Sequence, residues 1–333
     1  METRKVQLSG GTTYTISLPK SWAEEHGIDA GSVISLTPND DGSLVVETAD
    51  PEGTTPDRTT VDIAASEPDE LIERVLALYL VGYDEVTLKH RGGYSDAQRQ
   101  AVTEAIDGLS GFETIEKTAH TLRLQDLIDA ATVDIRKTTL RLRLIALSMH
   151  EDAIRAITDH DEALADRVVA RDAEVDKLFA RVTRYFRRSL SDLKEVKNLG
   201  YSRDDLFEYY YTGRQLERIA DHAEKIASFV RDRDQPLSDD LLEQIDHLGS
   251  SSRSIVDDAA RVVLEDAAVD VAYETLRQRN TLRDAITAAD RQLYDHVDPE
   301  AAHVAGLVFD SIRRTSEYGA NIAEIGIQRH CRD

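Results

Sequence analysis

The sequence predicts a multidomain protein: a small all-β domain at the N-terminus, a small α/β domain in the middle, and an all-α C-terminal region of two tandem three-helix bundles. Three observations predict this organisation. Short apolar runs separated by turn residues occur before residue 50, strand and helix patterns alternate up to residue 125, and a 3.6-residue apolar periodicity continues from there. A length of 333 residues is enough for two or three domains.

The charge composition is strongly acidic. Asp and Glu total 63 against 40 Lys and Arg, and nine of the basic residues are lysines, which leaves 31 arginines. Dense carboxylates keep a folded chain hydrated in concentrated salt, so the composition favours an extreme halophile. The single cysteine, Cys331, has no partner for an intrachain disulfide. Because the sequence shows no apolar signal core and no stretch long enough to span a bilayer, we expect a cytoplasmic protein without membrane insertion.

The first domain, residues 1–49, begins with a predicted hairpin and a short helix. The strands Arg4–Leu8 and Thr12–Leu18 flank a pair of glycines, which favour a tight turn. Ser21 and Glu24 have the spacing of a capping box, so a helix is expected to begin there.

A second hairpin completes this domain. Its strands are predicted at residues 33–36 and 44–47, around a turn at residues 39–42. So small a unit makes a poor solitary core, and we therefore expect it to pair with a second copy. Residues 50–57 contain two prolines and a glycine and are predicted to be a linker.

Residues 58–125 alternate between strand and helix patterns, as is typical of a small α/β domain. The predicted helices are residues 69–81 and 95–109. The predicted strands are residues 59–64, 86–90, 112–117 and 120–124, and the last two close the domain as a pair.

The rest of the chain is predicted to be almost entirely helical, and it repeats itself. Residues 150–155 resemble residues 256–261, and residues 216–227 resemble residues 312–323. Such a repeat indicates two tandem three-helix units. We call them copy one, residues 126–232, and copy two, residues 236–330.

Two pairs of acidic residues in copy one are candidate metal ligands. Asp172 and Asp176 are four residues apart, as are Glu217 and Asp221, so each pair lies on one helix face with about 5–6 Å between Cβ atoms. If the two helices are antiparallel neighbours, the four carboxylates converge, and oxygen donors of this kind suit Mg, Mn, Ca or iron. His222 points about 100° away from Asp221 and is not expected to be a ligand. In a chain with 63 acidic residues, such pairs also arise by chance on solvated faces.

Both pairs lie in runs that resemble a known family. The run Gln-Leu-Glu-Arg-Ile-Ala-Asp-His-Ala-Glu-Lys-Ile-Ala at 215–227 resembles the last helix of a PhoU bundle, and Asp-Ala-Glu-Val-Asp-Lys-Leu at 172–178 resembles the middle helix. The resemblance covers about residues 127–330 as two copies. It implies an all-helical regulator of phosphate uptake and signalling whose paired acidic motifs carry metal. Carried over residue by residue, the ligands of copy one are Asp172, Asp176, Glu217 and Asp221.

The same resemblance implies a cofactor and a partner. The cofactor is a divalent or trivalent metal ion: iron, Mg, Mn or Zn. The partner is the ATPase of the phosphate ABC transporter or another phosphate-signalling protein. A carboxylate-bundle enzyme would usually carry Glu-x-x-His motifs, which neither acidic pair has, and no nucleophile–base set stands out, so we expect no enzymatic activity.

Copy two departs from this ligand pattern. Glu317 keeps the second carboxylate on the last helix, but Arg313 replaces the first. On the middle helix the candidate is Asp284, which aligns with Asp176 or, in an alternative register, with Asp172. An arginine aimed into the site would replace a ligand with a positive charge, so we expect weak metal binding or none.

The N-terminal domain carries a second resemblance. The run from Arg4 to Trp22, with its Leu-Pro-Lys element at 18–20, and the following Gly27-Ile28 resemble an AbrB/MazE/SpoVT swapped-hairpin domain. That resemblance implies a homodimer whose interleaved hairpins present basic residues to DNA. The implied phosphate contacts are Arg4, Lys5 and Lys20, and Thr12, Thr13 and Tyr14 can add polar contacts. The alternative is a hairpin that serves for dimerisation alone.

Charge does not favour DNA binding here. Residues 1–48 hold three basic residues and seven acidic ones, a net charge of −4. Binding that depends on counterion release also weakens steeply in concentrated salt, so base contacts, shape or bound cations would have to contribute. From the two resemblances we expect a dimeric, DNA-binding transcriptional regulator of phosphate homeostasis. The alternatives are an adaptor to the phosphate transporter that does not bind DNA, and a carboxylate-bundle metal-binding protein.

Overall fold

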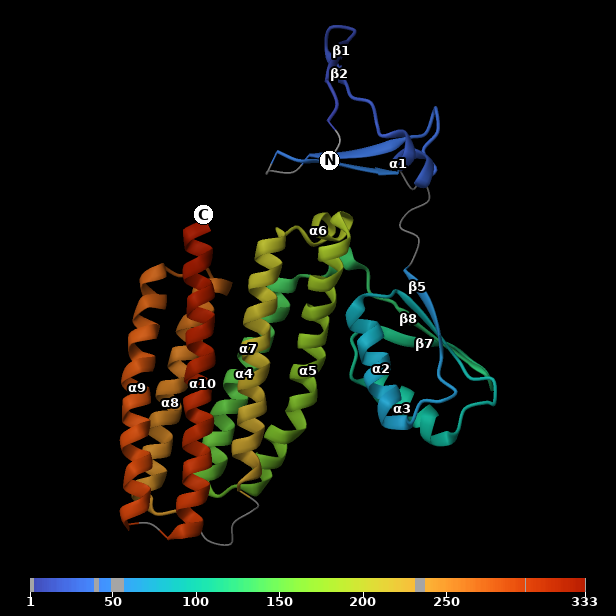
Figure 1. Ribbon diagram of the computed structural model, residues 1–333. Coiled ribbons are helices and arrows are strands. Elements are labelled where there is room, and N and C mark those ends of the chain that lie inside the picture. Colours follow the sequence, from blue (N-terminus) through green and yellow to red (C-terminus); the bar gives the residue numbers. More distant parts are fainter. Residues whose placement is uncertain (1–2, 39–41, 49–56, 231–236, 297, 333) are drawn as a thin grey trace. The chain divides into compact units, whose positions relative to one another are not determined.

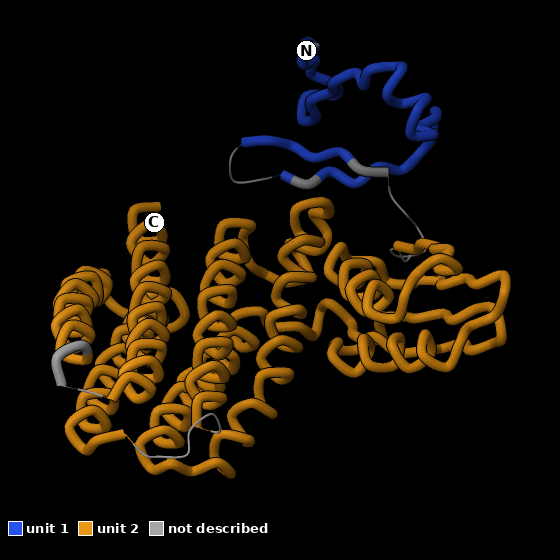
Figure 2. Tube along the Cα trace, turned by 60° about the horizontal axis from the view of Figure 1, so that its bottom comes forward, with its two compact units in different colours: residues 1–56 blue, residues 57–333 orange. Residues whose placement is uncertain are grey.

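A computed structural model describes residues 3–38, 42–48, 57–230, 237–296 and 298–332 (Figure 1). The chain divides into two compact units, residues 1–56 and residues 57–333 (Figure 2). The predicted fold class is confirmed: short strands at the N-terminus, an α/β region in the middle and helical bundles at the C-terminus. Within the ranges just given, no helix combines the length and the apolarity that a membrane crossing requires.

The first unit consists of two antiparallel hairpins and one helix. Its elements are β1 (Gln7–Ser9), β2 (Thr13–Thr15), α1 (Lys20–Glu25), β3 (Ile34–Pro38) and β4 (Leu44–Thr48). The first hairpin turns at Gly10 and Gly11, whose φ values of 64° and 81° favour glycine. Residues 39–41 of the expected second turn and residues 50–56 of the expected linker lie outside the described residues.

Two local predictions for this unit need correction. Strands β1 and β2 pair over three positions each and are shorter than the apolar pattern predicts, because a lone two-stranded hairpin gains little from a longer ladder. The predicted capping box at Ser21 is wrong. The helix begins one residue earlier, with Pro19 at the capping position and no side-chain cap, so Ser21 lies inside the first turn.

The α/β part of the second unit is a four-stranded sheet with two helices on one face (Figure 1). The strand order is β5-β6-β8-β7; β5 and β6 are parallel and the other pairs are antiparallel. The elements are β5 (Arg58–Asp62), α2 (Pro68–Val81), β6 (Glu85–Lys89), α3 (Asp96–Asp107), β7 (Phe112–Lys117) and β8 (Thr121–Asp126). Alternating residues such as Val86, Leu88 and Leu124 point into the core beneath the helices.

The helical part consists of two three-helix bundles. After a short 3-10 turn (Ala130–Thr132), copy one contains α4 (Ile135–Asp159), α5 (Glu162–Ser191), α6 (Leu193–Leu199) and α7 (Arg203–Ser228). Copy two contains α8 (Asp239–Leu264), α9 (Val269–His296) and α10 (Pro299–Arg332). The short helix α6 was not predicted; Asp192 both ends α5 and caps α6, and Gly200 ends α6 in the left-handed region.

The two bundles share one core and are joined by charged contacts between α4 and α8 and between α7 and α10. Arg143 on α4 donates to Asp257 and to Glu265 at 2.6 Å, and Arg329 on α10 donates to Glu208 on α7 at 2.6 Å. These contacts hold the repeats side by side.

A buried arginine joins the α/β part to copy one. Arg184 on α5 is fully buried and donates to the carbonyls of Tyr79 at 2.6 Å and Tyr83 at 3.0 Å, and to the carboxylate of Asp126 at 3.0 Å. Because a buried guanidinium is stable only when its donors are satisfied, this contact fixes α5 against the end of α2.

Candidate functional site

The four predicted metal ligands of copy one lie on neighbouring helices, α5 and α7, and interact with one another electrostatically. Burial, followed by the nearby carboxylates of Asp176, Glu224 and Asp221, raises the pKa of Asp172 to about 7. Burial raises the pKa of Glu217 to about 7 as well, with Asp221 as the next contribution. The four carboxylates therefore influence one another's protonation across the two neighbouring helices.

Two oxygens of these carboxylates are buried and have no hydrogen-bond partner: Oδ1 of Asp172 and Oε2 of Glu217. Glu217 is 9% exposed, and its other oxygen accepts a hydrogen bond from Arg214 at 2.6 Å. A buried carboxylate oxygen without a partner is costly, and a cation is one species that would satisfy it.

We define the acidic cluster as Asp172, Asp176, Glu217, Asp221 and Glu224. Glu224 was missed by the sequence analysis, although its signal is present: it follows Asp221 by three residues and Glu217 by seven, on the same face of α7. Burial is the largest cause of the raised pKa of Asp172 and of Asp221, and the charge of Glu224 contributes to both shifts.

The acidic cluster fits a hard cation in its donor chemistry, since it offers carboxylate oxygens and two of them lack a partner. In the described part of the chain, however, no three His, Cys, Asp or Glu side chains are placed to hold a metal ion. Arg214 also holds Glu217. Metal binding would therefore require side chains to rearrange.

The corresponding residues of copy two are paired with arginines. Glu317 accepts from Arg313 at 3.0 Å and from Arg314 at 3.2 Å, and Arg313 also bonds Asp310. On α9, the side chain of Asp284 is 78% exposed and lies 3.6 Å from Arg283. The arginines already supply the positive charge that a metal would bring.

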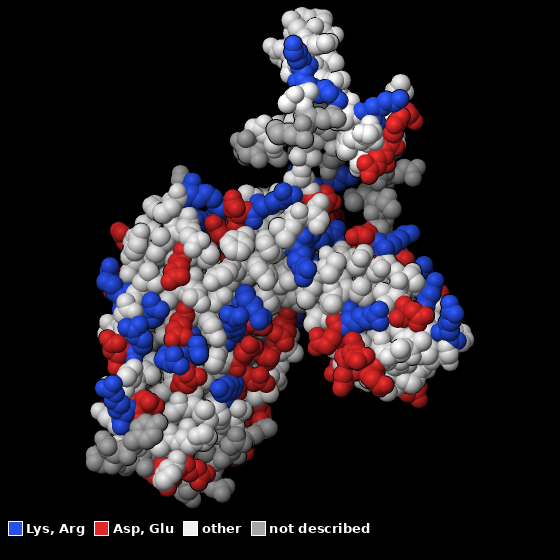
Figure 3. Space-filling model, in the orientation of Figure 1, with Lys and Arg blue, Asp and Glu red and all other residues white. Residues whose placement is uncertain are grey.

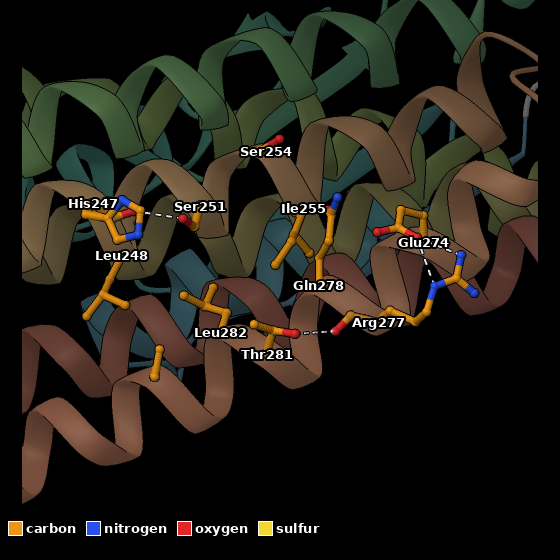
Figure 4. A pocket seen from close by; sticks show the side chains of 11 residues that line it. His247, Leu248, Ser251, Ser254, Ile255, Glu274, Arg277, Gln278, Thr281 and Leu282 are labelled. Atoms are coloured by element: carbon orange, nitrogen blue, oxygen red, sulfur yellow. Dashed lines mark hydrogen bonds and ion pairs between the residues drawn. The ribbon is translucent and has the colours of Figure 1, made fainter.

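A groove of about 380 Å³ lies between α8 and α9 of copy two (Figure 4). It is lined by polar side chains such as His247 and Gln278 over an apolar floor that includes Leu248 and Leu282. Its arginine, Arg277, is bound to a carboxylate of the same helix. None of the predicted site residues lines this groove.

The predicted DNA-contacting residues are all exposed on the first unit. Arg4 and Lys5 precede β1, and Thr12 precedes β2, which contains Thr13 and Tyr14. Lys20 begins α1, where its Nζ lies 3.5 Å from a carboxylate oxygen of Glu24.

Among residues 3–36, 38 and 42–46 of the first unit none is buried, so these residues form no core of their own. Seven large apolar side chains are each more than half exposed: Val6, Leu8, Tyr14, Ile16, Val33, Leu36 and Leu44. Exposed apolar surface on this scale marks a contact surface.

Two family models match the chain. The model of the PhoU domain matches residues 139–230, which contain the whole acidic cluster. The model described as antidote-toxin recognition MazE, bacterial antitoxin, matches residues 7–54. Among curated proteins, none matches the chain significantly.

Two solved structures are similar to the chain. The crystal structure of PhoU from Pseudomonas aeruginosa is 21% identical, with a TM-score of 0.49, over 60% of this chain and 96% of that one. The crystal structure of the phosphate transport system regulatory protein PhoU from Streptococcus pneumoniae is 18% identical, with a TM-score of 0.49, over 60% of this chain and 94% of that one.

Proposed function

We propose that this chain, which carries a PhoU domain at residues 139–230 and a MazE-like domain at residues 7–54, is a DNA-binding transcriptional regulator of phosphate uptake. The PhoU match carries the proposal, because it contains the acidic cluster that the sequence singled out. The helical part senses phosphate status through a partner or a bound metal, and it biases DNA binding by the first unit.

Dimerisation through the first unit is the next part of the proposal. Its support is the exposed apolar surface of the two hairpins, which a second copy would cover. Dimerisation would also double the number of exposed cations, Arg4, Lys5 and Lys20 of each chain, that face one DNA duplex. The net charge of −4 on residues 1–48 means that base contacts and shape must supply most of the specificity.

The signal is proposed to enter at copy one. A regulator of this kind needs two conformations with different affinity for DNA, and a ligand that binds one of them more tightly. The ligand candidates are a metal ion in the acidic cluster (iron, Mg, Mn or Zn) and a phosphate-signalling partner such as the transporter ATPase. Copy two, with its paired carboxylates, is proposed to be structural.

Genome-wide DNA occupancy of the tagged protein, in its host with and without phosphate, tests the proposal. We expect occupancy near phosphate-transport genes that changes with phosphate. The absence of enrichment in both conditions would favour the adaptor function, in which the hairpins serve for dimerisation alone.

The double substitution Arg4→Ala and Lys5→Ala separates the two functions more directly. A DNA-binding regulator should lose occupancy while its dimer persists in size-exclusion chromatography with light scattering. An adaptor should show no change in either measurement.

A further inference from the structure

Beyond the acidic cluster, α5 and α7 carry a continuous run of aromatic rings. We define the aromatic ladder as Phe179, Phe186, Phe207, Tyr210 and Tyr211. The ring of Tyr210 on α7 stacks on Phe186 at 4.7 Å and on Phe179 at 5.8 Å, both on α5. The ring of Phe207 lies 6.1 Å from Phe186 and 6.0 Å from Tyr211.

The aromatic ladder is only partly covered by the protein. Phe207 is 41% exposed, and Leu190, further along α5, is 56% exposed. The other four rings are half-buried and pack their inner sides against the core. These side chains form an apolar strip, which no described residue of the chain covers completely. Exposed apolar strips of this kind mark binding surfaces.

The aromatic ladder and the acidic cluster lie on one continuous face. Along α7, residues 207, 210, 214, 217, 221 and 224 follow one another at spacings of three or four, which places them along one side of the helix. Arg214 joins the two halves: its guanidinium lies 5.5 Å from the ring centre of Phe179 and donates to Glu217. In Figure 3, carboxylates gather over the middle of these two helices. We call this surface the acidic–aromatic face.

The acidic end of this face is hollowed. A groove of about 480 Å³ lies between α5 and α7, and its polar lining consists of Asp166, Glu224, Lys225 and Ser228. A side chain that enters this groove would therefore lie beside Glu224, the residue at which the groove borders the acidic cluster.

We propose that the acidic–aromatic face binds a peptide segment of a partner protein that carries Arg or Lys at one end and large apolar side chains at the other. The basic side chains lie against the acidic cluster, where they relieve the repulsion between its carboxylates. The apolar side chains cover the aromatic ladder, and aromatic rings also attract cations. This proposal rests on the proposed function, because it names the chemistry of the signalling partner.

Charge argues against the other occupants. A second copy of this chain would bring a net charge of −23 to an acidic surface, and nucleic acid would bring phosphates. A cationic segment is attracted by the same field, which also speeds its association. A metal ion and the peptide would use the same carboxylates, so each should weaken the binding of the other.

The test is fluorescence anisotropy of the full chain with a labelled synthetic peptide. The probe is a helical peptide with four arginines in its N-terminal half and three leucines and a phenylalanine in its C-terminal half. We expect saturable binding that weakens with salt. Phe207→Ala and Asp221→Asn should each weaken it about fivefold to tenfold, since each removes part of one half of the face. Leu190→Ser provides a second variant at the edge of the face.

Matched controls come from the rest of the bundle. Tyr273→Ala removes an aromatic side chain on α9 that is 44% exposed, similar to Phe207, and Glu317→Gln changes the counterpart of Asp221 in copy two. Neither should alter binding. Circular dichroism of each variant checks that it is folded.

Three results would overturn the proposal: no saturable binding, equal losses in the test and control variants, or equal binding of a peptide whose arginines are replaced by glutamates. The result of the peptide test can be distinguished from the result of the DNA-occupancy test of the proposed function. If the peptide binds but DNA occupancy does not respond to phosphate, the regulator proposal fails and the binding face stands. If occupancy responds but the peptide does not bind, the binding face alone fails.

Discussion

The last helices of the two bundles, α7 and α10, differ in the order of their charges. In α7, Arg214 donates to Glu217 three residues later; in α10, the corresponding pair is Asp310 and Arg313. The two opposite charges are three residues apart in both helices, but their order along the chain is reversed. The reversal leaves α7 with a carboxylate facing α5, and it leaves α10 with an arginine that binds the carboxylate of Glu317.

This comparison shows that a repeated fold does not repeat its site. Both helices keep the apolar positions that build the shared core, such as Ile226 and Ile322. The polar face is under no such packing constraint, so two differences decide whether carboxylates cluster or are neutralised: the exchanged charges on the last helix and the missing acidic pair on the middle helix. Stability is shared between the copies, whereas the candidate chemistry lies in one of them.

The largest expected difference between the copies is in metal binding. Asp221→Asn should lower the affinity of the purified chain for Mn²⁺ by about 10- to 100-fold, the range seen when the surroundings of a metal site are altered. Glu317→Gln should leave it unchanged. Isothermal titration calorimetry and metal analysis measure both effects. Equal metal binding in wild type and Asp221→Asn would contradict a site in copy one.

Packing should differ between the copies at one glycine. A Cβ atom added at Gly319 on α10 would lie 2.9 Å from Cγ2 of Ile255 and 3.1 Å from the backbone nitrogen of Val256 on α8. Gly319→Ala should therefore lower the free energy of unfolding by about 1–3 kcal/mol. The equivalent residue of α7 is Ala223, where Ala223→Gly should cost about 1 kcal/mol through helix propensity. Denaturant unfolding compares them, and a Gly319→Ala protein as stable as wild type would refute the close approach.

The acidic cluster should also produce a pH dependence of stability in the metal-free protein. Burial raises the pKa values of Asp172 and Glu217 to about 7, from ordinary values near 4. The folded state therefore holds protons that the unfolded state has lost. The stability from these protons is complete below about pH 4 and is lost as the pH rises through 7.

Between about pH 5 and pH 8, we therefore expect the Tm of wild type to fall relative to the Tm of Asp172→Asn as the pH rises. Buried His150, whose pKa burial lowers to about 3, has the opposite sign, since its contribution is lost as the pH falls below about 6.5. This contribution is common to both proteins and cancels in their difference. Parallel Tm curves would show that Asp172 does not titrate as described.

The smallest expected effect concerns the arginine that borders the acidic cluster. Arg214→Gln removes the cation that binds Glu217, so the affinity of copy one for Mn²⁺ should rise by about twofold to fivefold, an effect of about 0.4–1 kcal/mol. In copy two, Arg313→Gln should produce no measurable Mn²⁺ site, because its middle helix places the exposed Asp284 where copy one has the acidic pair of α5. Lower affinity in Arg214→Gln would mean that the arginine supports the site.

Much of the architecture follows from local patterns that the sequence carries by itself. The 3.6-residue spacing of apolar residues predicts the helical C-terminal region, and the strand β7 begins and ends where its pattern predicts, at Phe112 and Lys117. The placement of Asp172 with Asp176, and of Glu217 with Asp221, on single helix faces also follows from helix geometry alone.

What only the tertiary structure decided is the environment of these residues. The pairing of α5 with α7 leaves Asp172 half-buried and Glu217 buried, adds Glu224 to their surroundings and stacks Tyr210 on two rings of the neighbouring helix. The fully buried Arg184 likewise had no local signal, because its partners lie about one hundred residues away in sequence. Helix periodicity is a property of neighbours along the chain, whereas burial and charge coupling depend on which faces meet, and the chain specifies those through its whole core.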